Sequence, residues 1–504
     1  MMFKLQKNHQ IIQCNIFQAT FMLSYRLQRW HEGIFYEIDC ARTMLSMIKC
    51  RGQDYFWRAI KVKKTMNTVL RLLLIPVLLF SMFAGMPAKA NAETDLGLTV
   101  DAAILIDADS GKILYEQNAD TSLGIASMTK MMTEYLLLDA IDAGTVKWDQ
   151  EYHVTDYTYR MSQNRALSNV PLRRDGSYTI RELYEAMAIY SANAATVAIA
   201  ETIAGTETEF LKLMNKKAEE LGLEGYKFVN ATGLNNADLF GMQPAGTGPE
   251  DENVMPAKSV AKLAYHLLKD HPKVLETSKI TKKTFREGTD DAIQMSNWNF
   301  MLPGLVFQYE GVDGLKTGTT NFAGHCFTGT AERNGTRLIA VVMKAVDAKG
   351  QGSYKARFDA TAKLFNYGFS QFTKHEIIPA NYKFKDQKTV KVTKGKEDSV
   401  AIAVKEPISF MVKSSEKDLY QPKLVLDKKS LEAKVKKGTV VGKVVIERTE
   451  GTDYGFIDGK DFASDVVTTA SVERASGFAL FFQGIGSFFG NLWGGITDFV
   501  GGLF

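Results

Sequence analysis

Cysteine and histidine are both scarce in this chain of 504 residues, which contains only four cysteines and seven histidines. Three of the cysteines lie within the first fifty residues, and the fourth is Cys326. No cysteine or histidine cluster has the spacing of metal ligands, so we predict that the protein binds neither a metal nor another cofactor. The few histidines form no obvious Ser/His/Asp set, and a nucleophilic serine would therefore depend on another base.

An excess of charge of either sign is also lacking. The chain has 61 lysines and arginines against 57 aspartates and glutamates, for a formal net charge of +4. No basic block is interleaved with aromatic residues, which argues against a nucleic acid partner. Hydrophobic residues make up 45% and charged residues 23% of the chain, as in folded proteins, and the length suggests two or three domains.

The N-terminal region contains one long apolar run, Val69–Phe83, with lysines before it and Ala90-Asn91-Ala92 after it. A positive segment, an apolar segment and a small-x-small site in this order are the features of a secretory signal peptide. We therefore predict a signal peptide at residues 66–92 and a mature start at Glu93. Residues 1–65 would be an upstream segment or the result of a mis-assigned start.

Two questions about this region stay open in the sequence. Met66 is a candidate start, but it leaves the preceding lysines outside the protein, whereas Met44 or Met47 would keep them. The alternative to cleavage is an uncleaved membrane anchor that follows a short cytoplasmic tail. After cleavage only Cys326 would remain, so the exported protein would have no internal disulfide.

Ser127 and Lys130 stand three residues apart at the start of an apolar helical run. Positions i and i+3 are neighbours on a helix surface, so the hydroxyl and the amine can face each other. The unpaired N–H groups at a helix N-terminus also favour negative charge, which suits a site where an oxyanion develops. The four-residue pattern alone also fits an N-cap serine followed by a solvated lysine.

Two later stretches combine polar residues with an apolar setting. Ser191-Ala192-Asn193 interrupts an apolar stretch within a helical region at residues 180–222, where buried polar groups need partners. Lys316-Thr317-Gly318 lies on a predicted strand, where glycine often marks the close approach of a ligand or of another backbone. Taken singly, the first stretch also fits a helix junction and the second a turn.

The surrounding patterns predict a mixture of strands and helices. Two hairpins are expected, at Ala102–Asp107 with Lys112–Glu116 and at Cys326–Glu332 with Thr336–Lys344. A helix is expected from about Ser353 to Tyr367, with Gly368 as its stop signal.

In this order and setting, the three motifs resemble those of the serine D-alanyl-D-alanine carboxypeptidases, the low-molecular-mass penicillin-binding proteins. The resemblance is carried by Ala126-Ser127-Met128-Thr129-Lys130, Ser191-Ala192-Asn193, Phe228–Leu234 (FVNATGL) and Gly311–Thr320 (GVDGLKTGTT). One departure is Ile125, where the family usually has proline. The resemblance implies an α+β, penicillin-binding/β-lactamase-like catalytic domain at residues 93–375, with an antiparallel sheet, helices on both faces and a helical subdomain.

The resemblance implies removal of the terminal D-alanine from a peptidoglycan stem peptide ending in D-Ala-D-Ala, through an acyl-enzyme on Ser127. Lys130 would accept the serine proton, Ser191 would relay it to the leaving amine, and Asn193 would position Lys130 and the substrate amide. Lys316 would stabilise charge. A lysine acts as a base only if its pKa falls from about 10.4, and which residue is the general base stays open. β-Lactam antibiotics would acylate the same serine.

The same resemblance implies a binding strand for the substrate. Thr317, Gly318 and Thr319 would pair with the substrate as an added strand. Backbone N–H groups of Ser127 and Thr319 would form the oxyanion hole.

Three further residues near the motifs are of interest. A cation is expected for the terminal carboxylate of the substrate, and Arg357 and Lys355 are the candidates, although either also fits a solvated helix charge. Cys326 follows Gly318 on the next strand, where a small buried side chain is expected. The alternative is a thiol near the cleft that reacts with modifying reagents.

The C-terminal part has two different patterns. Short alternating runs predict a small all-β domain at residues 376–471, which would serve as a spacer or a wall-contact module. At residues 472–504, large apolar side chains recur at helical spacing, which predicts an amphipathic helix that anchors the protein to the membrane surface. Asn491, Asp498 and several glycines argue against a spanning helix. The alternative is a helix docked on its own domain.

Two other functions compete with the carboxypeptidase. A β-lactamase would need an added glutamate that holds a water, and no Glu-x-x-Leu-Asn element occurs between Ser191 and Lys316. A non-catalytic muropeptide-binding protein would not need all three motifs. The sequence therefore predicts an exported serine carboxypeptidase at the extracytoplasmic face of the bacterial cell membrane.

Overall fold

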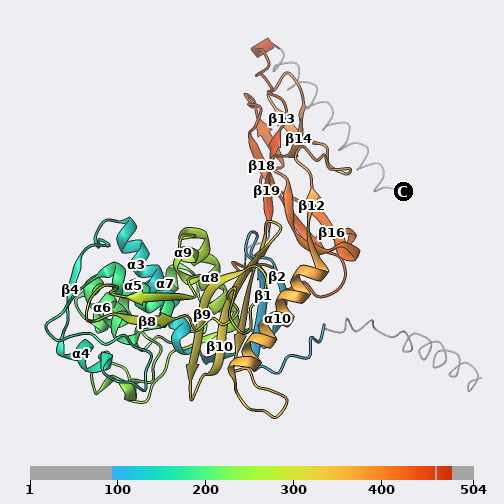
Figure 1. Cartoon of the computed structure of the whole chain (residues 1–504). Coiled ribbons are helices and arrows are strands. Elements are labelled where there is room, and N and C mark those ends of the chain that lie inside the picture. The colour runs from blue at the N-terminus through green and yellow to red at the C-terminus, as the bar shows by residue number, and fades with distance from the viewer. Residues whose placement is uncertain (1–93, 460–461, 479–504) are drawn as a thin grey trace, which may run out of the picture. The chain divides into compact units, whose positions relative to one another are not determined.

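The computed structural model describes residues 94–459 and 462–478, which belong to one compact unit, Asn91–Phe504. The first feature is a five-stranded antiparallel sheet with the strand order β2-β1-β11-β10-β9 (Figure 1). Its strands are β1 (Ala102–Asp107), β2 (Ile113–Gln117), β9 (Val312–Thr320), β10 (Gly324–Arg333) and β11 (Thr336–Met343). Both predicted hairpins are therefore present, as β1–β2 and β10–β11.

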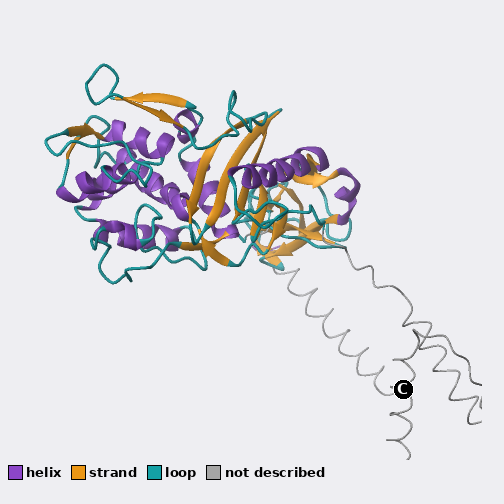
Figure 2. Ribbon diagram, turned by 60° about the horizontal axis from the view of Figure 1, so that its bottom comes forward, coloured by secondary structure: helices purple, strands orange, loops and turns teal. Residues whose placement is uncertain are grey.

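Helices pack on both faces of this sheet. Every residue of β1 is buried, as expected for a strand covered on two sides. Ile104 and Ile106 pack in one cluster with α8 (Ala257–Asp270), whereas Leu105 packs in another with α10 (Tyr354–Gln371). Figure 2 shows the strands lying among these helices. The fold class predicted from the motifs is confirmed.

The predicted stop at Gly368 is wrong, because α10 continues through it to Gln371. Gly368 lies against the sheet, where an added Cβ would stand 2.5 Å from Leu338 Cδ1 and 2.9 Å from Leu105 Cδ2. The glycine therefore allows a helix to approach two strands closely and does not end the helix.

A helical subdomain adjoins the sheet. Its helices are α3 (Lys130–Asp142), α4 (Asp156–Ser162), α5 (Ile180–Tyr190), α6 (Asn193–Ala204), α7 (Glu207–Glu220) and α9 (Val274–Ser278), with the short 3₁₀ helices η2 (Ala126–Thr129) and η3 (Asn236–Leu239). Three two-stranded ribbons accompany them: β3 (Ser122–Gly124) with β6 (Val254–Pro256), β4 (Glu151–His153) with β5 (Ser177–Thr179), and β7 (Lys282–Phe285) with β8 (Ile293–Ser296). The first eight residues of α6 are all buried, so this helix is part of the core.

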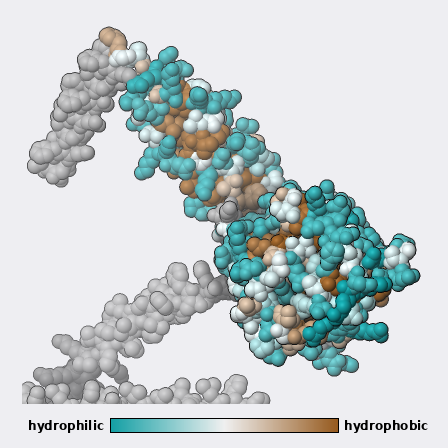
Figure 3. Space-filling view, turned by 90° about the vertical axis from the view of Figure 1, so that its left-hand side faces the viewer, coloured by the Kyte–Doolittle hydropathy of each residue, from teal (hydrophilic) through white to brown (hydrophobic). Residues whose placement is uncertain are grey.

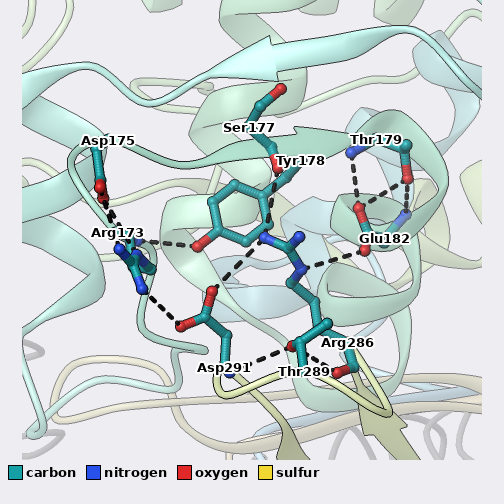
Figure 4. Close-up of polar contacts among 9 residues, drawn as sticks. All are labelled: Arg173, Asp175, Ser177, Tyr178, Thr179, Glu182, Arg286, Thr289 and Asp291. Carbon is teal, nitrogen blue, oxygen red and sulfur yellow. Dashed lines mark hydrogen bonds and ion pairs between the residues drawn. The ribbon is translucent and has the colours of Figure 1, made fainter.

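A polar network fixes the start of α5 (Figure 4). Thr179 and Glu182 form a capping box, in which Glu182 accepts a hydrogen bond of 2.8 Å from the Thr179 N–H. Arg286, which follows β7, lies 3.6 Å from Glu182 and 3.6 Å from Asp291. The β7–β8 ribbon is thus tied to the start of a helix whose other end carries the Ser-x-Asn motif.

Beyond α10 the described chain forms strands and one 3₁₀ helix, η4 (Ser414–Leu419). β12 (Phe372–Ile378) pairs with β15 (Ile408–Lys413). A six-stranded sheet has the order β16-β18-β19-β14-β13-β17. Its strands are β13 (Thr389–Thr393), β14 (Ser399–Val404), β16 (Tyr420–Leu426), β17 (Ser430–Glu432), β18 (Val440–Arg448) and β19 (Ala463–Thr468). The all-β character predicted for this region is confirmed.

The predicted signal peptide and most of the predicted amphipathic helix lie outside the described residues. Within residues 94–459 and 462–478, no helix has the length and apolar character needed to span a bilayer. On the face shown in Figure 3, hydrophilic residues cover much of the described surface and hydrophobic residues form patches between them.

Candidate active site

Ser127 and Lys130 meet where the 3₁₀ helix η2 leads into α3. Ser127 lies within η2 rather than in the first turn of an α-helix, and Lys130 is the first residue of α3. The Nζ atom of Lys130 lies 3.0 Å from Ser127 Oγ. Ser127 is partly exposed, whereas Lys130 is only 1% exposed, so the hydroxyl is open to a substrate and the amine is not.

The other two partners of Lys130 are carbonyl oxygens. Nζ lies 2.8 Å from Asn193 Oδ1 and 2.7 Å from the Thr232 carbonyl oxygen. Neither oxygen can donate a hydrogen, so a neutral amine uses its two N–H groups on them. Its lone pair is then left for the Ser127 hydroxyl. The geometry is therefore compatible with the neutral form of Lys130, which can accept a proton from the serine.

Burial is the main cause that holds the pKa of Lys130 well below its usual value, and the nearby cation Lys316 lowers the pKa further. The buried carboxyl of Glu207 acts in the opposite direction. The pKa of Lys316 is itself lowered to about 7, chiefly by burial and then by Arg357, against the effect of Glu134. Two lysines whose pKa values are both lowered, chiefly by burial, thus share one buried region.

Ser191 and Asn193 lie at the junction between α5 and α6. Ser191 caps α5 with a φ of 61°, a left-handed conformation that a serine adopts rarely. Asn193 Nδ2 donates a hydrogen bond of 3.0 Å to the Ser168 carbonyl, which turns Oδ1 toward Lys130. The break in the apolar sequence is therefore both a helix junction and a part of the site.

The Lys-Thr-Gly motif lies on β9, at the edge of the sheet. Lys316 is 6% exposed, and its Nζ donates a hydrogen bond of 3.1 Å to the Thr317 carbonyl. At Gly318, an added Cβ would stand 2.5 Å from the Ile125 carbonyl oxygen. Glycine is therefore needed for β9 to pass beside η2, and the outer edge of this strand has no partner strand among the described residues.

Arg357 reaches the same strand from α10. It is 1% exposed, and its Nη1 donates hydrogen bonds of 2.9 Å to Thr319 Oγ1 and 3.2 Å to the carbonyl oxygens of Gly318 and Cys326. Burial lowers its pKa to about 10, so it stays a cation at neutral pH. Lys355, the other candidate, is exposed and pairs with Asp359 on its own helix.

These residues line one cavity of about 430 Å³. Its lining includes Ser127, Ser191, Asn193, Thr317, Thr319 and Arg357. Lys130 and Lys316 lie behind it, in the buried region. A larger hollow, of about 560 Å³, is lined by Ser259 and Lys262 among others, but there the Ser259 hydroxyl donates to the Glu224 carbonyl and the Lys262 amine donates to the Gly222 carbonyl.

Sequence reasoning missed an aromatic wall of this cavity. Trp298 stacks on Tyr190 and on Tyr354, with ring centroids 6.2 Å apart in each pair. Its Nε1 donates a hydrogen bond of 3.1 Å to the Tyr190 carbonyl. The three rings come from separate segments of the chain, so no local pattern could bring them together. Arg165 and Ser168 complete the list of polar lining residues that the motifs did not indicate.

Cys326 is fully buried, and burial raises its thiol pKa to about 11. A buried neutral thiol is unreactive, which agrees with the reading of Cys326 as a small packing residue. Among residues 94–459 and 462–478, no group of three or more His, Cys, Asp or Glu side chains is placed to hold a metal ion.

Comparison with known proteins is an independent line of evidence. Residues 88–347 match the D-alanyl-D-alanine carboxypeptidase family, and residues 372–474 match the C-terminal domain of penicillin-binding protein 5. D-alanyl-D-alanine carboxypeptidase DacF of Bacillus subtilis is 31% identical over 420 residues, which cover 83% of this chain and 97% of that protein. DacC of Escherichia coli is 28% identical and covers 82% of this chain and 91% of its own length.

Solved structures agree with these matches. The peptidoglycan synthesis regulatory factor PBP3 of Streptococcus pneumoniae is 34% identical with a TM-score of 0.60, and covers 74% of this chain and 99% of its own. Penicillin-binding protein 5 of Haemophilus influenzae is 26% identical with a TM-score of 0.59, and covers 75% of this chain and 98% of its own.

Proposed function

The chain belongs to the D-alanyl-D-alanine carboxypeptidase family, and on this premise we propose the part that each residue of the cavity plays. The protein is a serine-type D-Ala-D-Ala carboxypeptidase, a hydrolase of peptidoglycan stem peptides. The observation that carries the assignment of residues is the set of partners around Lys130: one serine hydroxyl and two obligate acceptors.

The reaction begins with Ser127 and Lys130. Ser127 Oγ attacks the carbonyl carbon of the penultimate D-alanine while its proton passes to Lys130 Nζ. The resulting oxyanion accepts hydrogen bonds from the backbone N–H groups of Ser127 and Thr319, and Lys316 stabilises the charge. Ser191, which lines the cavity beside Ser127, relays the proton to the leaving amine. The C–N bond then breaks and D-alanine leaves, with an ester on Ser127.

Water completes the cycle. Lys130 takes a proton from a water molecule, the hydroxyl attacks the ester carbonyl, and the proton returns to Ser127 Oγ as the C–O bond breaks. The products are the shortened stem peptide and the free enzyme. Asn193 holds Lys130 in place through both halves, because its amide is fixed by Ser168.

The substrate is held along the open edge of β9. An extended peptide that adds to this edge pairs with the backbone of Thr317, Gly318 and Thr319. The terminal carboxylate of the substrate meets the cationic end of the cavity, where Arg357 contacts Thr319. A free C-terminal carboxylate is what distinguishes a carboxypeptidase substrate from an internal peptide bond.

β-Lactams acylate the same serine in this proposal, as the names of the penicillin-binding relatives suggest. A β-lactamase would need an added acidic residue that holds a water for rapid deacylation, and no aspartate or glutamate is among the described residues that line the cavity. Incubation with benzylpenicillin followed by peptide mass analysis tests both points. A stable adduct on the peptide that holds Ser127 supports the proposal, whereas rapid turnover without an adduct supports a β-lactamase. Absence of any reaction would favour a non-catalytic muropeptide-binding protein.

The arrangement along the chain is also proposed. A signal peptide at residues 66–92 directs export, the catalytic domain spans residues 93–375, and a β-rich domain spans residues 376–471. An amphipathic helix at residues 472–504 then anchors the enzyme to the outer face of the cell membrane. Deletion of residues 472–504 should release active enzyme into the soluble fraction. Retention in the membrane fraction would point to an N-terminal anchor instead.

A further inference from the structure

The segment Phe228–Leu234, which the resemblance marks but the reaction above does not explain, lies directly behind Lys130. Its Thr232 carbonyl is one of the two obligate acceptors for Lys130, at 2.7 Å. Asn230 Oδ1 accepts hydrogen bonds from the N–H groups of Thr232 and Gly233, at 3.0 and 2.7 Å. At Gly233, where φ is 80°, an added Cβ would stand 1.9 Å from the Ala126 carbonyl oxygen. The segment is therefore locked against η2.

One buried carboxyl group holds this segment from the other side. Glu207, the first residue of α7, is 6% exposed, and its Oε1 accepts a hydrogen bond of 2.9 Å from the Ala231 N–H. Its Oε2 accepts a hydrogen bond of 3.3 Å from the Tyr157 hydroxyl. Thr133, on the same helix as Lys130, donates to the Ala231 carbonyl at 2.8 Å. Ala231 precedes Thr232, so Glu207 is two peptide groups from the oxygen that Lys130 contacts.

Glu207 also interacts electrostatically with Lys130. Its charge raises the pKa of Lys130, and Lys130 in turn lowers the pKa of Glu207. Burial raises the pKa of Glu207 to about 7, against the hydrogen bonds from Ala231 and Tyr157, and the nearby Glu201 raises it further. Lys316 is the other charged group that faces Lys130. A carboxyl group in the core is costly, so its presence beside a reactive amine calls for a functional reason.

We propose that Glu207 is a positioning residue for Lys130: it fixes the Thr232 carbonyl through the Ala231 N–H, and its negative charge balances the ammonium that forms when Lys130 accepts the Ser127 proton. The inference rests on the proposed role of Lys130 as the proton acceptor. Glu207 does not touch the substrate; it acts through the 230–234 segment and through its charge.

The test separates these two contributions. Glu207→Gln keeps an acceptor for the Ala231 N–H and removes the charge, whereas Glu207→Ala removes both. The pH profile of kcat/KM for diacetyl-Lys-D-Ala-D-Ala is measured for each variant together with Tm. Without the negative charge the pKa of Lys130 falls. The acid limb of the kcat/KM profile of Glu207→Gln should therefore move to lower pH by roughly half a unit to one unit. Its maximal rate should fall roughly 3- to 10-fold, because the ammonium is less stabilised.

Matched variants make the result specific. Glu209→Gln removes an exposed carboxyl group from the same helical turn, one that pairs with Lys212, and should leave the profile unchanged. Tyr157→Phe removes a hydrogen bond that favours the charged form of Glu207. The acid limb of the kcat/KM profile of this variant should therefore move to lower pH, as in Glu207→Gln, but by a smaller amount. It also serves as the test if Glu207→Gln does not fold.

The positioning role of Glu207 is overturned if the acid limb of the profile stays in place in both Glu207→Gln and Tyr157→Phe, whatever the change in Tm. The same would follow if Glu209→Gln shifted the limb equally. The assignment of Lys130 is tested separately by the wild-type enzyme: a profile with no acid limb at all would refute Lys130 as the proton acceptor, whereas an unmoved limb refutes the role of Glu207 alone.

Discussion

Lys130 Nζ lies 3.0 Å from Ser127 Oγ, and the lysine is almost completely buried. Because its remaining partners are two carbonyl oxygens, the amine is held in a geometry where the neutral form satisfies every hydrogen bond. The distance alone does not make a base; burial and the nearby Lys316 lower the pKa of Lys130, and the two acceptors hold its amine in place. This relationship turns a common four-residue pattern into a pair that can transfer a proton.

Replacing Lys130 with arginine should abolish acylation while the protein stays folded. Arginine is also a long basic side chain, but it is not deprotonated at working pH, so no base faces the serine. The rate of Ser127 acylation by a β-lactam should fall by roughly 10²- to 10⁴-fold. Rapid-quench mass analysis measures this rate, and circular dichroism checks the fold. Acylation within a factor of two of the wild type would exclude Lys130 as the base.

Lys316→Met should shift the pH profile in the opposite direction to Glu207→Gln. The Lys316 cation lowers the pKa of Lys130, so its removal lets that pKa rise. Lys130 is active when neutral, and the acid limb of kcat/KM should therefore move to higher pH, by roughly one unit. A shift to lower pH would mean that the two lysines do not interact as described.

Arg357→Gln should weaken substrate binding more than turnover. The guanidinium is held by Thr319 and by two carbonyl oxygens, so its charge is fixed at the end of the cavity. Loss of a charged hydrogen-bond donor should raise KM by roughly 10- to 100-fold. Lys355→Gln, two residues away on the exposed side of the same helix, is the matched control and should leave KM unchanged. Equal effects in the two variants would contradict the assignment of Arg357.

Glu134 should make the stability of the protein depend on pH. Burial raises its pKa from 4.5 to about 7, against a hydrogen bond from Tyr184 and the charge of Lys316. Because the folded pKa is raised, the contribution of Glu134 to stability is full below pH 4.5 and is lost as the pH rises through about 7. The Glu134→Gln variant stays neutral. Its free energy of unfolding, relative to that of the wild type, should therefore rise by about 2 to 3 kcal/mol from pH 5 to pH 8.

Urea denaturation at the two pH values measures this difference. Glu209→Gln, an exposed substitution, should show no such gain. A difference between Glu134→Gln and wild type that is the same at pH 5 and pH 8 would show that the folded-state pKa of Glu134 is not raised above its unfolded value.

The family resemblance was enough to predict the fold class, and alternating runs with turn signals were enough to predict the two hairpins. Helical spacing connected Ser127 with Lys130, but the sequence could connect this pair with Lys316 only through the family resemblance, since no periodicity relates η2 to β9. The predicted helix stop at Gly368 was wrong because a glycine that packs on a sheet and a glycine that ends a helix look alike in sequence.

The residues that sequence reasoning missed share one property: their roles depend on contacts across the chain. Trp298 becomes a wall of the cavity only because it stacks on Tyr190 and Tyr354. Glu207 looks like an ordinary acidic residue in the first turn of a helix, where the helix dipole favours negative charge. Only its contact with Ala231 reveals the link to Lys130.

Release of D-alanine is the most direct measure of the central claim. The enzyme from Glu93 onward is incubated with diacetyl-Lys-D-Ala-D-Ala, and free D-alanine is followed with a D-amino-acid oxidase assay. We predict steady release by the wild type, no release by Ser127→Ala, and no release by either from the same peptide ending in L-alanine. Failure of the wild type to release D-alanine, or undiminished release by Ser127→Ala, would contradict the account.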